Sequence, residues 1–153
     1  FVVSGGSSLQ EWVNERYLKA FGLPEVHIYD RDLLTNGKYK YQDARDTVNA
    51  RGDGSIAFLT SKREMENYLH LDAINEAMYS VIGSPLAFHL DDDCDVEGEI
   101  KCATGQNRFS RRSIKHWLNE DAVEKMTLDR LRLRNGYEEI HGWFAAIQMR
   151  ATK

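Results

Sequence analysis

The chain has 153 residues and a mass of 17.6 kDa, a length that suits one domain. It is 42% hydrophobic and 29% charged, which excludes a disordered tail because a core can form. The mean hydropathy is −0.55, and no apolar run approaches the roughly 20 residues of a membrane span, so we expect no membrane partner. The net charge of −4 does not indicate nucleic-acid binding, so a polyanion would need a local basic patch or bound cations.

The chain opens on Phe1 rather than on methionine, and its first apolar stretch lacks the basic region of a signal peptide. We therefore expect a fragment of a longer protein. The two cysteines, Cys94 and Cys102, fit neither a disulfide scaffold nor a zinc spacing. Free thiols in a reducing cytoplasm are the simplest interpretation, so we expect a cytoplasmic protein.

The first 60 residues predict an alternation of strands and helices. The apolar run 1–4 predicts a strand, and a glycine turn then leads into a helix over 9–21, where apolar residues recur at intervals of three and four. Short β-favouring runs predict strands over 25–29 and 55–59, with a helix over 41–50 between them. This order of elements predicts a right-handed parallel α/β sheet.

The pattern changes after residue 60. A helix is expected over 61–82, broken near His70 and ended by the glycine and proline at 83–85. A short strand is predicted over 86–90, and the acidic stretch 91–95 is expected to be a loop or the start of a helix.

The last part of the chain is predicted to be helical. A short helix over 127–133 begins at Thr127, and a final helix over 137–149 follows. The fold class is therefore α/β, a small parallel sheet flanked by helices, with an α/β core over 1–105 and a helical extension over 106–153 packed on the same domain. The residues of the final helix expected to face inward are Ile140, Trp143, Phe144 and Ile147.

Asp30 and Asp32 are the strongest candidates for chemistry, because both follow a predicted parallel strand. Ligands of open α/β sheets bind at the carboxyl ends of the strands, and residues two apart on a strand share a side. Two neighbouring carboxylates repel each other unless a cation neutralises them, and Mg²⁺ takes carboxylates together with substrate phosphates. A solvated turn is the alternative interpretation of this pair.

A second candidate segment follows the third predicted strand and reaches the same edge of the sheet. Glu64 and Glu66 could add a carboxylate there, and Arg63 could bind a phosphate oxygen. The alternative is an ordinary first turn of a helix, where the helix dipole favours glutamate. The glycine turn 5–8 could present backbone N–H groups to an anion, but it matches neither the dinucleotide fingerprint nor the P-loop.

The densest basic segment is 110–116, which contains Arg111, Arg112 and Lys115. It is the best place in this acidic chain for a phosphate backbone, and an amphipathic helix with a cationic face is the alternative. The acidic stretch 91–95 lacks the glycine and glutamate of a calcium-binding EF-hand loop, so we expect it to be solvated. The five histidines show no spacing of a zinc site or a catalytic triad.

Three of these segments together resemble the TOPRIM (topoisomerase–primase) domain of OLD-family and related defence-associated ATPase–nuclease proteins. They read IYDRD at the second strand, KREMENYL after the third, and IKHWLN followed by KMT around Lys115. By this resemblance Asp30 and Asp32 match the DxD metal motif, and Glu66, with Glu64 beside it, matches the acidic residue that follows. Lys115 resembles the basic residue that these nucleases place near the scissile phosphate.

The resemblance has one departure, at the end of the first predicted strand. The family has a glutamate there, in an EGxxD-like turn, whereas this chain reads VVSGGSS. Ser4 or Gly5 stands in place of the glutamate, and Ser8 in place of the aspartate. That glutamate binds metal or acts as general acid–base in the family, so its absence puts catalytic activity in question. Glu11, one helical turn further on, is a possible substitute.

The resemblance implies a Mg²⁺- or Mn²⁺-dependent endonuclease of DNA or another nucleic acid, in antiviral defence. Asp30, Asp32 and Glu66 would hold the metal, and Lys115 would neutralise charge on the phosphate. The implied partners are an ATPase domain in the same or a partner chain and a second copy of the chain. Two alternatives stay open: a catalytically degenerate TOPRIM domain serving as a scaffold, and a Rossmann-like phosphatase or phosphotransferase with Asp30 as nucleophile.

Overall fold

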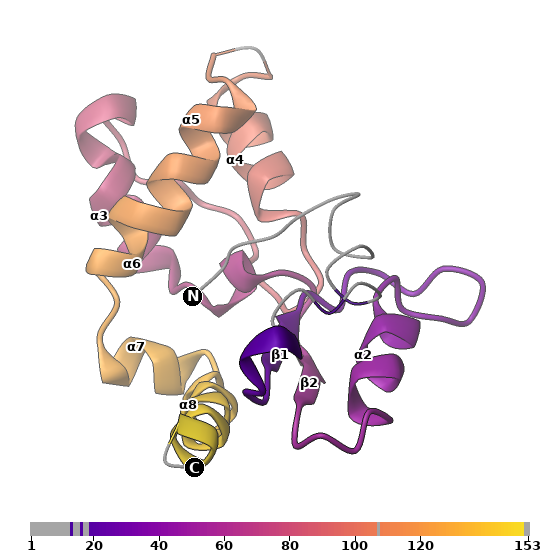
Figure 1. The fold of residues 1–153 in the computed structure, drawn as a ribbon. Helices are drawn as coiled ribbons and strands as arrows, with labels where there is room; N and C mark the ends of the chain where they lie inside the picture. The colour runs from indigo at the N-terminus through magenta and orange to yellow at the C-terminus, as the bar shows by residue number, and fades with distance from the viewer. Residues whose placement is uncertain (1–12, 14–15, 17–18, 107, 152–153) are drawn as a thin grey trace. The chain divides into compact units, whose positions relative to one another are not determined.

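The structure is a computed structural model that describes residues 13, 16, 19–106 and 108–151 (Figure 1). The chain divides into two compact units. Unit 1 comprises residues 1–60 and 143–153, and unit 2 comprises residues 61–142. The boundary after residue 60 lies inside the α/β core that the sequence predicts over 1–105. The second half of the last helix belongs to unit 1.

Unit 1 is built on a small parallel sheet, as the sequence predicts. Strand β1 (Val26–Tyr29) pairs with β2 (Ile56–Leu59) in register, from Val26 opposite Ile56 to Tyr29 opposite Leu59. Helix α2 (Gln42–Asn49) joins the two strands and lies beside them in Figure 1. The sheet has two strands among the described residues, and a short 3-10 helix, η1 (Lys19–Phe21), precedes it. The predicted strand 1–4 and most of the predicted helix 9–21 lie outside the described residues.

Helix α2 is attached to the sheet by a polar clamp and by a small apolar core. The Asn49 side chain accepts a hydrogen bond from the Ala57 N–H (2.8 Å) and donates one to the Ala57 carbonyl (3.1 Å), so it satisfies both backbone groups of that residue. The core of unit 1 consists of four buried residues, Val13, Tyr29, Val48 and Ala57.

The regular secondary structure described in unit 2 is helical, and loops such as 83–95 connect the helices. Its elements in chain order are the 3-10 helix η2 (Met65–Tyr68), α3 (Leu71–Ile82), α4 (Val96–Thr104), α5 (Arg111–His116), the π-helical segment η3 (Trp117–Asp121), α6 (Ala122–Glu124), α7 (Leu128–Leu133) and the first part of α8 (Tyr137–Ala151). A larger core of nine buried residues holds it together: Leu69, Ile74, Met78, Leu86, Val96, Ile100, Ile114, Leu118 and Ala122.

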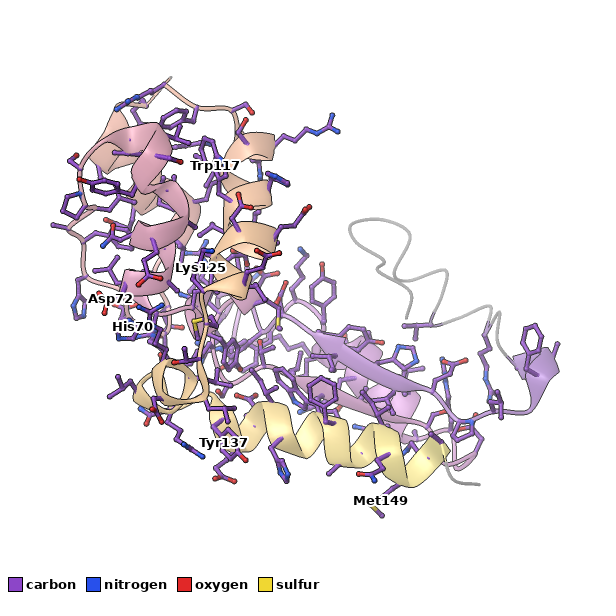
Figure 2. All side chains as sticks on the ribbon, turned by 90° about the vertical axis from the view of Figure 1, so that its left-hand side faces the viewer. His70, Asp72, Trp117, Lys125, Tyr137 and Met149 are labelled. Atoms are coloured by element: carbon purple, nitrogen blue, oxygen red, sulfur yellow. The ribbon has the colours of Figure 1, made fainter. Side chains whose placement is uncertain are left out.

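Polar side chains begin four of these helices. The His70 ring, labelled beside Asp72 in Figure 2, accepts a hydrogen bond from the Asp72 N–H at the start of α3 (3.2 Å). Asp95, Ser110 and Thr127 accept in the same way at the starts of α4, α5 and α7. The predicted break near His70 and the predicted cap at Thr127 are confirmed. Residues 61–64 are not helical, so the predicted helix over 61–82 is too long.

The predicted strand over 86–90 is wrong. Side chains, not a neighbouring strand, satisfy its backbone groups: Asn75 accepts from the Leu86 N–H (2.6 Å) and donates to the Leu86 carbonyl (3.2 Å). Arg134 donates to the Leu90 carbonyl (2.7 Å). An extended chain held by side-chain amides and guanidinium groups needs no sheet.

The final helix forms as predicted, and its inward face is narrower than predicted. Trp143 and Ala146 are buried, whereas Phe144 is 60% exposed, so its predicted inward orientation is wrong. Ile140 and Ile147 are half-buried. Phe144 lies one residue beyond Trp143, about 100° further round the helix, which takes it out of the buried stripe. Within the described residues, no helix has both the length and the apolar character needed to cross a membrane.

Candidate functional site

The predicted carboxylate pair lies in unit 1, in the loop that leaves β1. The strand ends at Tyr29, and Asp32 has a left-handed backbone (φ +56°), so strand alternation does not place Asp30 and Asp32 on one side. Thr60 anchors this loop: its N–H donates to the Tyr29 carbonyl (2.9 Å) and its hydroxyl accepts from the Arg31 N–H (2.8 Å). The loop therefore starts from a fixed point at the carboxyl ends of both strands.

The two aspartates have different surroundings. Asp32 is 26% exposed in its side chain and lies 3.2 Å from the ammonium group of Lys40, which is itself 60% exposed. Asp30 is half-buried. A surface lysine is easily displaced, so the Asp32 carboxylate is accessible to another cation. Searching the described residues finds no group of three or more histidine, cysteine, aspartate or glutamate side chains that could hold a metal.

The other predicted residues come together in unit 2. Glu66 on η2 is buried, and its carboxylate lies 2.5 Å from the Lys115 ammonium on α5. The Glu64 carboxylate lies 3.6 Å from the same ammonium group. A buried carboxylate needs a partner of opposite charge, and Lys115 supplies it here. The structure thus brings Glu64, Glu66 and Lys115 together within this unit.

A capping box explains why the two glutamates take these positions. Glu64 and Asn67 cap η2 reciprocally, and the Glu64 N–H donates to the Asn67 side-chain oxygen (3.0 Å). The Asn67 amide is fully buried and also donates to the carbonyls of Asp91 (3.1 Å) and Cys94 (3.0 Å). One asparagine therefore holds η2 against the acidic loop.

The acidic stretch 91–95 is solvated, as the sequence predicts, because its four aspartates are exposed, and contacts within unit 2 also hold it in place. Buried Lys62 pairs with Asp92, and Arg134 donates to the carbonyls of Leu90 and Asp91. Asp95 caps α4. Asp92 and Asp95 therefore have structural roles within unit 2.

The π-helical segment η3 is a feature that the sequence analysis missed. It widens the helix directly after α5 and places Asn119, whose amide donates to Glu66 at 3.4 Å, on the same carboxylate as Lys115. Insertions of this kind are frequent at functional sites. The run WLNED carries no special signal, because a π-turn depends on tertiary packing and not on local propensity.

Lys115 is charged at physiological pH. Burial tends to lower the pKa of its ammonium group, but the hydrogen bond that it donates to Glu66 and the charges of Glu66, Glu64 and Glu97 outweigh that effect and raise the pKa above its ordinary value. The side chain is 30% exposed. It therefore remains a permanent cation with one part open to solvent.

The three predicted arginines differ in their availability. Arg63 donates to the Asp93 carbonyl (3.3 Å), and Arg111 lies 3.0 Å from the buried Glu97 carboxylate. Among the residues that the structure describes, Arg112 has no carboxylate within ion-pair distance, and it lines a surface hollow of about 580 Å³. Lys115 lines the same hollow, so Arg112 and Lys115 together present positive charge to it.

A buried polar chain in unit 1 was also missed. Arg51 donates to the Glu25 carboxylate (2.6 Å), the His27 ring lies 2.7 Å from that carboxylate, and the Tyr29 hydroxyl lies 2.8 Å from the other ring nitrogen. The two ring nitrogens of His27 are thus engaged on opposite sides, one by the Glu25 carboxylate and the other by the Tyr29 hydroxyl. The alternation of polar and apolar residues in EVHIY was the available signal, because residues 25, 27 and 29 share one side of a strand.

The charged side chains in this hydrogen-bonded row stabilise the fold of unit 1. Burial tends to raise the pKa of Glu25, but hydrogen bonds from Arg51 and His27 and their charges lower it below its ordinary value. Burial raises the pKa of Tyr29 to about 12. Arg51 also donates to the Val13 carbonyl (2.7 Å). This row of hydrogen-bonded side chains therefore connects the start of the sheet to the C-terminal end of α2 and to residue 13.

Comparison with family models, with curated proteins and with solved structures finds no match to this chain. The TOPRIM resemblance therefore rests on the motifs of the sequence alone. Its glutamate position in the first predicted strand, with Ser4, Gly5, Ser8 and Glu11, lies outside the described residues.

Proposed function

We propose that this chain is a metal-dependent nuclease module that hydrolyses phosphodiester bonds of DNA, as the TOPRIM resemblance implies. The observation that carries the proposal is Lys115, a cation held by buried Glu66 and open to a hollow that Arg112 also lines. A nuclease needs fixed positive charge where negative charge develops on the phosphate. Local cations also answer the objection raised by the net charge of −4.

Asp30 and Asp32 are the proposed holders of Mg²⁺ or Mn²⁺. Their oxygen donors suit a hard cation, and magnesium commonly takes one or two carboxylates and completes its shell with water and substrate phosphate. The accessible Asp32 carboxylate fits this requirement. When bound, the metal would activate water and stabilise the leaving oxygen.

The remaining residues act on the substrate or on one another. Lys115 neutralises phosphate charge, and Arg112 binds a neighbouring phosphate. The Glu66 carboxylate positions the Lys115 ammonium, which lies 2.5 Å from it. The Asn119 amide donates to the same Glu66 oxygen at 3.4 Å and so helps to orient that carboxylate. Glu66, assigned to the metal by the resemblance, is on this geometry a positioning residue for Lys115.

One observation favours the second candidate, a catalytically degenerate module that binds nucleic acid without cutting it. Glu64 and Glu66 are neutralised by Lys115, so a metal would have to displace an ammonium group to reach them. The ATPase partner, a homodimer and a cytoplasmic location belong to both versions of the proposal. The free thiols of Cys94 and Cys102 support the last of these.

Nicking of supercoiled plasmid in Mg²⁺ and in Mn²⁺ tests the proposal, with wild type beside Asp32→Asn. Asparagine tolerates the left-handed backbone at this position and removes the charge, so the variant isolates the carboxylate. Asp43→Asn is the matched control, because Asp43 is an exposed aspartate of unit 1 paired with Lys38. We expect metal-dependent nicking that Asp32→Asn abolishes and Asp43→Asn preserves.

Folded wild-type protein that binds DNA but does not nick it in either metal would support the degenerate module. Nicking that survives Asp32→Asn would contradict the assignment of metal binding to this loop. Binding of Mn²⁺, followed by its paramagnetic effect on water relaxation, separates a metal-free binding module from a nuclease that lacks its ATPase.

A further inference from the structure

A surface hollow on unit 2 carries an inference that rests on the proposed function and makes its substrate class specific. All the residues that line the hollow lie between 112 and 120 on α5 and η3, so one continuous piece of helix shapes it. Figure 2 labels Trp117, the residue at which α5 passes into the π-helical segment. The side chains that matter to the argument are Arg112, Lys115, His116, Trp117, Asn119 and Glu120.

The charges of the hollow suit phosphate groups. Arg112 is exposed and has no carboxylate within ion-pair distance in the part of the chain that the structure describes. Lys115 is held at the edge of the hollow by Glu66. The one acidic side chain of the lining, Glu120, is engaged by His116 at 3.0 Å. Arg112 and Lys115 therefore bring positive charge to the hollow, and the Glu120 carboxylate already has a partner in the His116 ring.

The same hollow contains a fixed aromatic ring. Trp117 is half-buried and meets Phe109 edge-to-face, with ring centroids 5.0 Å apart and planes at 90°. Phe109 and Trp117 both pack against the core of unit 2, so the indole loses little freedom when a ligand binds. An oriented aromatic surface beside cations binds flat groups by stacking.

Cations and an aromatic ring in one hollow match a single-stranded nucleic acid better than a duplex. A duplex presents its phosphates outward and keeps its base faces stacked on one another, so a protein tryptophan finds no face to meet. A single strand exposes base faces and phosphates together, and proteins that bind it combine basic grooves with aromatic platforms. We propose that the hollow on α5 and η3 binds a single-stranded segment, with a base on Trp117 and flanking phosphates at Arg112 and Lys115.

Fluorescence anisotropy with labelled oligonucleotides tests this proposal in the presence of EDTA, which separates binding from cleavage. The probes are an oligothymidine of about 15 nucleotides, within the range that such sites cover, and a duplex of mixed sequence of the same length. We expect the wild-type chain to bind the single strand more tightly than the duplex and to lose tryptophan fluorescence on binding.

Two variants and one control locate the site. Trp117→Phe keeps a ring against Phe109, and we expect it to weaken single-strand binding about fivefold and to remove most of the fluorescence change. Arg112→Gln is on the surface, so it should fold, weaken binding and reduce the salt dependence by about one phosphate contact. Arg132→Gln is the control, because Arg132 is exposed in unit 2, pairs with Asp129 and is outside the hollow.

The outcomes separate this inference from the proposed function. Equal or tighter binding of the duplex, with no effect of Trp117→Phe, would overturn the single-strand inference and leave a nuclease of duplex DNA in place. Binding of neither probe by folded protein would overturn the inference directly. If such protein nevertheless nicks plasmid in Mg²⁺, the proposed function survives and the substrate binds elsewhere.

Discussion

Two of the carboxylate–cation pairs that the structure describes, Glu25–Arg51 in unit 1 and Glu66–Lys115 in unit 2, differ in what surrounds them. In unit 1, Glu25 and Arg51 lie 2.6 Å apart with side chains 12% and 5% exposed. In unit 2, Glu66 and Lys115 lie 2.5 Å apart with side chains 6% and 30% exposed. The first pair is closed on both sides, whereas the cation of the second reaches solvent. This accessible cation is the reason why the proposed site is placed at the second pair and not at the first.

The choice of cation fits this difference. The Arg51 guanidinium uses its fork to donate to both Glu25 and the Val13 carbonyl, so its hydrogen bonds serve the fold. Lys115 carries a compact charge on a flexible stem, which can keep its contact with Glu66 and still meet a phosphate.

Removing the Lys115 ammonium has the largest expected effect. Lys115→Met leaves the buried Glu66 carboxylate without its cation, and we expect the free energy of unfolding to fall by about 3 kcal/mol. Urea unfolding measures the loss. The double variant Lys115→Met with Glu66→Gln should recover part of it, since no unpaired charge then stays buried. A single variant as stable as wild type would show that the pair is not structurally coupled.

The second-largest effect is expected from adding a side chain at Gly136, which packs next to η2. Gly136 is buried, and a Cβ there would lie 2.7 Å from Tyr68 Cδ1 and 2.8 Å from Leu131 Cδ1, so Gly136→Ala should cost about 2 kcal/mol. Gly142→Ala is the matched control, because a Cβ at Gly142 in α8 would meet nothing within 4 Å. There we expect a gain of about 0.5–1 kcal/mol from helix propensity. Thermal unfolding of the two variants should shift in opposite directions.

The smallest effect is expected at the closed pair of unit 1, and it depends on pH. The pKa of Glu25 is lowered from 4.5 in the fold, so its stabilisation is present above about pH 4.5 and is lost as the pH falls through the folded-state pKa. Glu25→Gln should therefore cost about 1 kcal/mol at neutral pH and progressively less in acid. Urea unfolding of Glu25→Gln and wild type across this pH range measures the difference in their free energies of unfolding. The control Glu124→Gln, at an exposed position, should leave the free energy of unfolding unchanged at both neutral and acid pH. Unchanged oligonucleotide binding by Glu25→Gln is also expected; weakened binding would contradict the structural role of this pair.

Much of the local structure could be read from the sequence because it depends on neighbouring residues. The β-favouring runs around Ile28 and Phe58 form the parallel pair, and Thr127 begins the helix that it was expected to begin. The strand predicted over 86–90 failed because Asn75 and Arg134, distant in sequence, satisfy its backbone groups. The predicted inward orientation of Phe144 was wrong because the width of the buried face of α8 depends on what packs against the helix.

The sequence by itself determined the α/β class, the order β1, α2, β2 in the described part of unit 1, and the helical second part. Periodicity, capping residues and charge act over a few positions, so they can be read along the chain. Only the tertiary structure decided that Glu66 holds Lys115, that a π-turn adds Asn119, and that Arg112 rather than Arg111 is available. Those choices depend on burial and on partners tens of residues away, and neither is encoded in local spacing.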